Sequence, residues 1–295
     1  MGESEFFGNL MELLCQNLYD ALYPHCSNIF DSIFVTLNTR MLDSSALLSQ
    51  DLESWNAGVF SIVKSAAENV CIPIAGAIFV FVFTWEITKM VEDNNLMQNV
   101  SPEKIAVILG KLVVCLYVTI NSFNIVMFIY SIGHWAVGKL SGTTPTFGAG
   151  VSLNDVVPAV PDEYNLTIVL QLLGILSALA VAWVFCQACG VIIYFQVINW
   201  FLDLGIYASA AAIPFSTFIN RDWGQTGMNY GKKVFALGLR GFFMFLFIAI
   251  YGGIITNLPG SSFMDVLFML LGAGGVLVGL IWKSGNIADS ILNAH

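Results

Sequence analysis

Charged residues are scarce in this chain. They make up 11% of its 295 residues, against about a quarter in soluble domains, while 57% of the residues are hydrophobic and the mean hydropathy is +0.77. This composition excludes an ordinary soluble globular domain. Several apolar runs approach the length of about 20 residues that crosses a bilayer as a helix. We therefore predict an all-α, polytopic integral membrane helical bundle.

The chain also lacks the motifs of common enzymes. No G-x-x-x-x-G-K-[ST] phosphate loop occurs, and the three histidines, His25, His134 and His295, are scattered and make no metal set. Eleven basic residues are too few for a groove that follows nucleic acid by neutralising phosphates. We expect no catalytic residues, no cofactor, no metal and no reading of DNA sequence.

The cysteines allow one enzymatic alternative. Cys186 and Cys189 have the spacing of a thiol redox pair, and Cys15 with Cys26 could supply a second pair, as in a quinone-linked disulfide-forming enzyme. Cys186 and Cys189 lie within an apolar run with no nearby cation to stabilise a thiolate. This setting favours small buried hydrophobic side chains over redox chemistry.

Apolar runs predict about five crossings and one irregular segment. The crossings lie near 70–90, 105–137, 166–201, 234–256 and 263–283. The third run continues to Phe218, which is too long for one crossing. Its end, 204–218, is rich in Ala and Ser and contains Gly205 and Pro214, which favours a re-entrant or interfacial segment. A kinked continuation of the preceding helix is the alternative.

The few basic residues predict the orientation. With five crossings, the N-terminus outside and the C-terminus inside, eight of the 11 lie at the cytoplasmic face, where basic residues are enriched. These eight are Lys89, Lys104, Lys111, Arg221, Lys232, Lys233, Arg240 and Lys283. A further crossing at 204–218 would split the positive charge between the two sides.

The first 69 residues differ from the rest of the chain. They carry nine acidic residues against Arg40 and Lys64, and apolar residues recur at helical spacing at Phe30, Ile33, Phe34, Leu37 and Met41. We predict an acidic, amphipathic-helical extracytoplasmic region over 1–69 and a transmembrane domain over 70–295.

Four ionisable residues fall at similar depth near the inner ends of the crossings. They are Glu86, Lys111, Asp203 and Arg240. Because unpaired charge in a bilayer is costly and tends to face the bundle interior, we predict an inner layer of paired charges that fixes helix positions or lines a vestibule. The alternative is that Lys111 and Arg240 extend to the cytoplasmic interface.

Small residues on the last crossing predict helix packing. Gly272, Gly275 and Gly279 share one face, and such a face lets another helix approach closely. A phosphate-binding loop is the less favoured interpretation.

A family resemblance rests on the fourth crossing and the residues before it. The run AIPFSTFINRDWGQTGMNYGKKVFALGLRGFFMFLFIAIYGGI (212–254) and the ending KSGNIADSILNAH resemble the TrbL-like (VirB-six-type) polytopic membrane subunit of conjugative type IV secretion systems, in the form carried by integrative elements of Firmicutes. The most specific pieces are the Ala-rich turn with Pro214, RDWG at 221–224, and Asn229 with Tyr230.

The resemblance implies a role in DNA transfer between bacteria. The chain would be a multi-pass, non-enzymatic channel or scaffold subunit of the cytoplasmic membrane, surrounded by phospholipids, with DNA as transient cargo. Its implied partners are other conjugation subunits, cytoplasmic ATPases included, and further copies of itself in a ring-like homo-oligomer.

The irregular segment is the predicted contact surface. Proline leaves a backbone carbonyl without its helical donor, and small neighbours let a partner helix cover it. The predicted contact residues are Ala208, Ala210, Ala211, Ala212, Pro214, Arg221, Asp222 and Trp223. The last three would emerge at the cytoplasmic interface and dock the ATPases. The alternative function is a secondary transporter that binds substrate at 204–218, although the sequence shows no matching broken helix in a second repeat.

Overall fold

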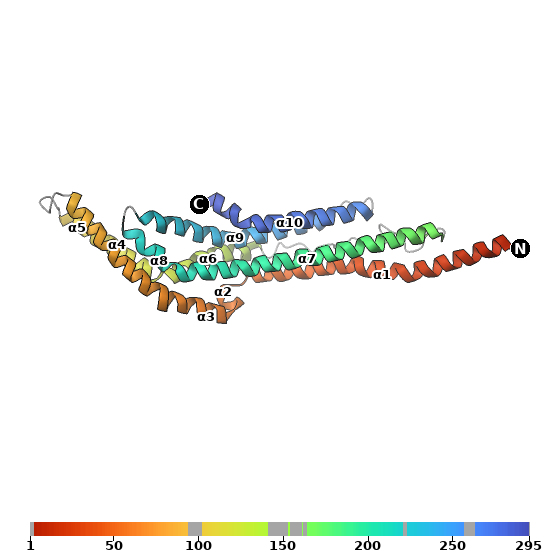
Figure 1. The fold of residues 1–295 in the computed structure, drawn as a ribbon, viewed down its shortest axis with the longest axis horizontal. Helices are drawn as coiled ribbons and strands as arrows, with labels where there is room; N and C mark the ends of the chain where they lie inside the picture. Colours follow the sequence, from red (N-terminus) through yellow and green to blue (C-terminus); the bar gives the residue numbers. More distant parts are fainter. Residues whose placement is uncertain are drawn as a thin grey trace. The chain divides into compact units, whose positions relative to one another are not determined.

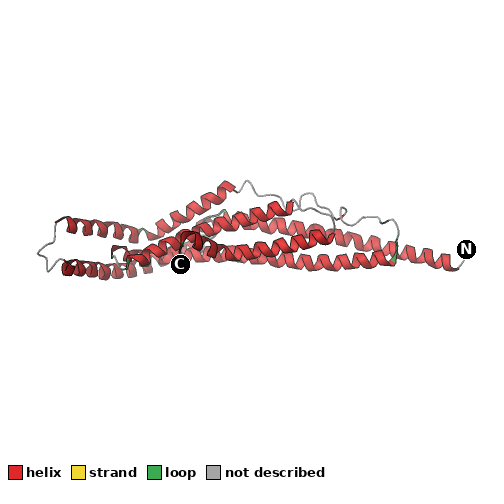
Figure 2. Cartoon of the chain, turned by 90° about the horizontal axis from the view of Figure 1, so that it is seen from above, coloured by secondary structure: helices red, strands yellow, loops and turns green. Residues whose placement is uncertain are grey.

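The computed structural model describes residues 3–93, 102–140, 153, 161, 164–220, 223–256 and 263–294. Within these ranges every regular element is a helix and no strand occurs (Figure 2). The all-α class predicted from composition and apolar run length is confirmed.

Long helices dominate the chain (Figure 1). In chain order the elements are α1 (Glu3–Leu48), α2 (Leu52–Trp55), α3 (Ala57–Ala66), the π-helical turn η1 (Ala67–Cys71), α4 (Ile72–Asp93), α5 (Pro102–Ile120), α6 (Ser122–Leu140), α7 (Leu166–Ala210), α8 (Ala212–Phe215), the 3-10 turn η4 (Ser216–Ile219), α9 (Gly224–Thr256) and α10 (Phe263–Leu292).

Among the described residues, four helical stretches are long and apolar enough to cross a membrane, or five if one bent pair counts as a single span. They are Ala57–Glu92, Leu166–Ala210, Gly224–Ile254 and Asp265–Leu292, with Ala106–Ile120 and Ser122–Leu140 as the bent pair. The predicted number of crossings agrees with this. The first stretch begins well before residue 70, because α3, η1 and α4 continue into one another without a break.

The second predicted crossing, 105–137, which Asn121 and Asn124 interrupt in the sequence, consists of two helices in the structure. The chain bends by 70° between α5 and α6, at Asn121. The Asn121 side-chain amide donates to the Tyr117 carbonyl at 3.0 Å. An Asn side chain competes in this way with the backbone for hydrogen bonds, so Asn is unfavourable in the interior of a helix.

The structure of the segment 204–218 differs from the prediction of a separate re-entrant segment. Its first seven residues are the end of α7, and the helix breaks only at Ala211. Pro214 explains the position, because it has no N–H to donate to the carbonyl of Ala210. The short α8 and η4 follow the break. The kinked continuation is therefore closer to the observed backbone.

The described chain divides into two compact units. Unit 1 contains 1–45, 143–195 and 246–281, and unit 2 contains 46–142, 196–245 and 282–295.

Unit 1 packs α1 against α7 and α10. Phe30, Ile33 and Phe34 of α1 meet Leu179 of α7 and Leu267 of α10 around a void of only about 10 Å³. The apolar positions that recur at helical spacing in α1, from Phe30 to Met41, are all buried. They belong to one helix of 46 residues. This pattern was sufficient to identify the packed face of α1.

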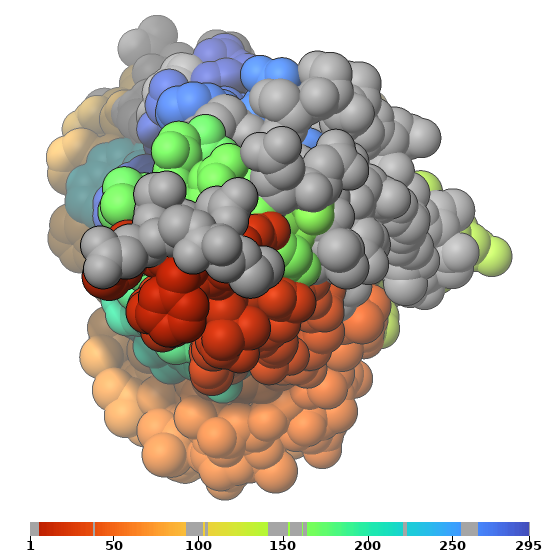
Figure 3. Space-filling model, turned by 90° about the vertical axis from the view of Figure 1, so that its right-hand side faces the viewer, coloured from red at the N-terminus to blue at the C-terminus, as the bar shows by residue number. Residues whose placement is uncertain are grey.

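The beginning of α1 has a different surface. Phe6, Phe7 and Met11 are each more than half exposed, and Figure 3 views this end of the helix (red) face on. The beginning of α1 therefore combines acidic residues with exposed apolar side chains.

Two close contacts hold the helices of unit 2 together, one between an aromatic ring and a glycine and one between two glycines. The Trp200 indole lies against Gly241, where an added Cβ would stand 2.4 Å from the ring, and its Nε1 donates to the Leu237 carbonyl at 2.9 Å. A Cβ on Gly133 of α6 would stand 2.3 Å from the Gly238 carbonyl oxygen of α9. Gly241 therefore leaves room for the Trp200 ring, and Gly133 is required because α6 and α9 approach backbone to backbone there.

We predict that Gly133→Ala destabilises the protein by about 1–3 kcal/mol, because the added methyl forces α6 away from α9. Gly110→Ala is the matched control, since nothing lies within 4 Å of its Cβ position. There the substitution should be neutral or slightly stabilising. Thermal unfolding in detergent, followed by tryptophan fluorescence, measures both. Equal melting temperatures would contradict the close contact.

Candidate functional site

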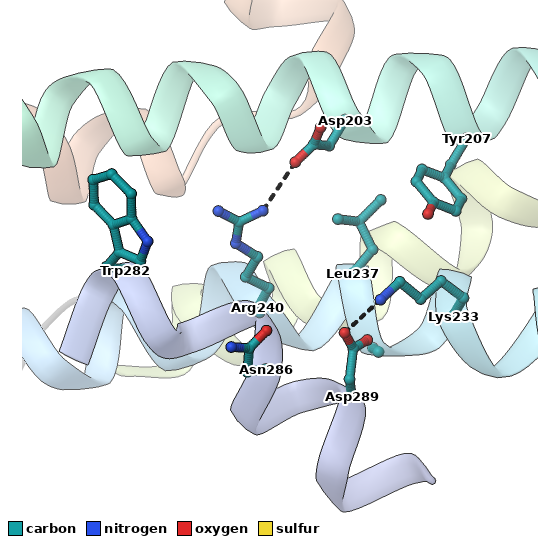
Figure 4. A pocket seen from close by; sticks show the side chains of 10 residues that line it. Asp203, Tyr207, Lys233, Leu237, Arg240, Trp282, Asn286 and Asp289 are labelled. Carbon is teal, nitrogen blue, oxygen red and sulfur yellow. Dashed lines mark hydrogen bonds and ion pairs between the residues drawn. The ribbon is translucent and has the colours of Figure 1, made fainter. Parts of the chain in front are cut away.

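A charged cavity of about 290 Å³ lies within unit 2. Residues of α7, α9 and α10 line it (Figure 4). They are Asp203, Tyr207, Lys233, Ala236, Leu237, Arg240, Trp282, Gly285, Asn286 and Asp289. Two cations and two anions thus meet among helices that are otherwise apolar.

Arg240 forms the centre of this cavity. Its Nη1 donates to Asp203 Oδ2 at 2.9 Å, its Nη2 to Gln196 Oε1 at 3.3 Å and its Nε to Ser284 Oγ at 3.4 Å. The arginine side chain is 12% exposed, so its charge is neutralised inside the protein. One guanidinium therefore fixes α9 against both α7 and α10.

A second ion pair joins Lys233 of α9 to Asp289 of α10. Both side chains are more accessible than Arg240, at 37% and 18% exposure. Sequence reasoning missed this pair, and counted Lys233 only as a topology signal. The sequence did contain a signal for a role of Lys233 in this cavity. Lys233 and Arg240 are seven residues apart, so they share one face of α9.

The structure brings two of the four predicted inner charges together. Asp203 and Arg240 form the ion pair described above. Glu86 accepts instead from the amide of Asn220, at 2.9 Å, and Lys111 is exposed on α5.

Asn220 connects α4 to the start of α9. It is 1% exposed, and its Oδ1 accepts from the backbone N–H of Trp223 at 3.0 Å. Its backbone carbonyl accepts from Gly224 at 2.8 Å. Asn220 therefore caps α9, and Glu86 orients the capping side chain. Neither role was foreseen from the sequence.

Most of the predicted alanine contact surface is covered by the chain itself. Ala208, Ala211 and Ala212 are fully buried, and the first two belong to an apolar cluster with Phe123 of α6. Ala210 is half-buried. Ala208 and Ala211 are thus covered by several elements of the same chain, since the cluster also contains Ala67 of η1 and Val234 of α9.

Two of the other predicted contact residues, Pro214 and Trp223, lie beside an apolar groove. Pro214 and Trp223 line a hollow of about 600 Å³ together with Phe81 of α4. The Phe81 and Trp223 rings are 6.0 Å apart, and both are exposed. Arg221 and Asp222 lie outside the described residues.

The predicted glycine face of α10 is open toward the described residues of the chain. None of their atoms lies within 4 Å of a Cβ built on Gly272 or Gly279, and among them Gly275 meets only the tip of Phe185, at 3.9 Å. The intrachain packing instead uses Gly274, which faces Phe185 and Tyr251 of unit 1.

All six cysteines are free thiols. Cys15 and Cys26 are both buried and are not bonded to each other, and the same holds for Cys186 and Cys189. Burial raises the pKa of the Cys26 thiol, which keeps it protonated near neutral pH. Among the described residues, no three His, Cys, Asp or Glu side chains come together as a metal site.

A family model described as "TrbL/VirB6 plasmid conjugal transfer like protein" matches residues 37–212. This match covers more than half of the chain. The chain belongs to this family. No curated protein and no solved structure matches it. The match runs from α1 through α7 and includes Asp203, whereas Arg240 and the run from Pro214 to Tyr230 lie beyond it.

We predict that Arg240→Gln lowers the unfolding free energy by about 2–3 kcal/mol, because it leaves the Asp203 carboxylate without its cationic partner and removes the donor to Gln196. Lys233→Gln should cost less, since its ion pair is more exposed to solvent. Adding Asp203→Asn to Arg240→Gln should recover part of the loss, because no unpaired charge remains. Melting temperatures of the four purified proteins, wild type included, test this order. A larger loss for Lys233→Gln would contradict it.

Proposed function

We propose that this chain is a subunit of a conjugative type IV secretion system, placed in the bacterial cytoplasmic membrane as a channel or scaffold component through which DNA passes as transient cargo. The family match over 37–212 carries this proposal. The four or five helices able to span a membrane support it, since they provide a multi-pass membrane body.

In this proposal the chain supplies architecture and its partners supply energy. The charged side chains of unit 2 form ion pairs and helix caps that hold helices in place. Work on DNA would then come from cytoplasmic ATPases. The groove lined by Phe81, Pro214 and Trp223 is the proposed partner contact, and the neighbouring Arg221 and Asp222 would add a charged pair beside it.

The proposed homo-oligomer uses α10. Gly272, Gly275 and Gly279 leave room for a helix of another copy, because almost nothing in the chain fills the space above them. Close approach at small residues gains van der Waals contact, which drives helix association in lipid.

For the orientation, we propose the N-terminus outside and the C-terminus inside, on the distribution of basic residues. In a background with the native cysteines replaced by Ala, Asp20→Cys should react with an impermeant maleimide on intact cells. Asn293→Cys should react only after lysis. Both positions are exposed, so lack of reaction reports the membrane and not burial. Labelling of Asn293→Cys on intact cells would exclude this topology.

For the function, donors with an in-frame deletion of the gene should transfer DNA only at background frequency, and the wild-type copy should restore transfer. Gly275→Leu should restore it poorly and shift the detergent-extracted protein to smaller oligomers, because the side chain blocks close helix approach. Gly110→Leu, at an open glycine of α5, is the matched control. Full transfer by the deletion strain would refute the proposed function, whereas normal oligomers of Gly275→Leu would refute only the α10 interface.

One observation favours the secondary transporter as a second candidate. Two broken helices meet in unit 2, since the cluster that contains Ala208 and Ala211 beside the α7 break also contains Phe123 beside the α5 and α6 bend. Paired broken helices are typical of transporters. Against this, the junction is filled by these apolar side chains. Substrate flux by the isolated protein in proteoliposomes would support the transporter, and a conjugation subunit should show none.

A further inference from the structure

The charged cavity of unit 2 retains hydrogen-bonding groups that its ion pairs do not use. Arg240 has five N–H donors, of which three are engaged, and one donor of the Lys233 ammonium reaches Asp289. Asp203 and Asp289 each accept these bonds through Oδ2. Among the described residues, no side-chain bond is formed by Oδ1 of either carboxylate. The residues that carry the unused donors and acceptors therefore all line the same hollow (Figure 4).

The lengths of α9 and α10 place the cavity near the end of the hydrocarbon of a bilayer. A helix needs about 20 residues to cross the hydrocarbon. Counted from the far ends of the α9 and α10 spans, such a length reaches Phe235 and Ser284. The third helix of the lining, α7, has 45 residues and is longer than one crossing, and Asp203 and Tyr207 lie near its C-terminal end. These positions fall within the stretches that line the cavity. Trp282, whose side chain is 66% exposed, stands at its rim, and tryptophan prefers the headgroup level of a membrane.

The formal charges of the lining select the class of ligand. Lys233 and Arg240 are balanced by Asp203 and Asp289, so the net charge is zero. A purely anionic ligand would meet two carboxylates, and a purely cationic one would meet two basic groups. A zwitterion satisfies both sets, and charged hydrogen bonds are the strong ones.

We propose that this cavity binds the ammonium phosphate headgroup of a zwitterionic phospholipid of the phosphatidylethanolamine class. The phosphate oxygens accept from Lys233 and Arg240, and the primary ammonium donates to Asp203 and Asp289. The cavity of about 290 Å³ accommodates such a headgroup of about eight non-hydrogen atoms, given that one water needs only about 10–15 Å³. The acyl chains extend from the rim at Trp282 into the hydrocarbon.

The number of N–H groups on the ligand also predicts which phospholipids bind to the cavity most tightly. A quaternary choline carries the same charge as ethanolamine but has no N–H to donate to the two carboxylates. Phosphatidylglycerol lacks the cation altogether. We therefore expect the affinity to fall from phosphatidylethanolamine to phosphatidylcholine and to phosphatidylglycerol. An electrostatic membrane surface effect would instead leave phosphatidylethanolamine and phosphatidylcholine equal.

The test uses the purified, delipidated full chain in detergent, titrated separately with these three lipids carrying identical acyl chains. Native mass spectrometry counts bound lipid, and thermal unfolding gives the shift in melting temperature. The variant Lys233→Gln/Asp289→Asn removes one charge of each sign from the cavity while Arg240 and Asp203 stay paired. Lys232→Gln/Glu53→Gln, which removes one charge of each sign elsewhere, is the matched control. Soluble phosphoethanolamine is a further arm.

We expect phosphatidylethanolamine to bind about tenfold more tightly to the wild type than to the cavity variant, the scale of lost charged hydrogen bonds, and the control variant to bind like the wild type. Equal affinities for phosphatidylethanolamine and phosphatidylglycerol, or unchanged binding by the cavity variant, would overturn the site. Saturation by soluble phosphoethanolamine at the same concentration as the lipid would overturn the assignment to a membrane lipid. If the cavity variant misfolds, the lipid ranking on the wild type alone decides the question.

Discussion

The arrangement of unit 2 depends on the neutralisation of the Arg240 guanidinium among apolar helices. A charge in such surroundings is tolerated only when hydrogen-bonded partners surround it. Arg240 finds them on two other helices, with Asp203 and Gln196 on α7 and Ser284 on α10. These bonds fix the rotation of all three helices about their axes. That rotation also places Lys233 opposite Asp289. The cavity lies between this ion pair and the pair of Arg240 with Asp203.

The sequence was informative wherever a signal is local and repeated along the chain. Low charge and long apolar runs correctly predicted the helical class and the number of possible spans. The spacing of Phe30, Ile33 and Phe34 correctly marked the packed face of α1. Asp203 and Arg240, two of the four ionisable residues selected from the sequence by their depth, form an ion pair. Each of these inferences needs only the helix period or the thickness of a bilayer.

Helix ends and packing partners were harder to predict, because they depend on competition between distant groups. Pro214 indicated a break in the helix, but the break falls earlier, at Ala211. It falls there because Pro214 has no N–H to donate to the carbonyl of Ala210. The small residues at 208–212 predicted close approach of another helix, yet composition does not say whether that helix comes from the same chain. In the structure, Ala208 and Ala211 share an apolar cluster with Ala67, Phe123 and Val234 of the same chain. The Glu86 bond to Asn220 joins residues 134 positions apart, and no local pattern reports such a distance.

The contact of Gly133 with Gly238 has a mechanical consequence. Side chains that interlock can change rotamer and yield, but two backbones in direct contact have nothing to rearrange. The helix α6 and the first half of α9 would therefore turn as one rigid lever in any motion of unit 2. The joints that such a lever requires are already present in its connections, at the bend beside Asn121 and at the break at Ala211.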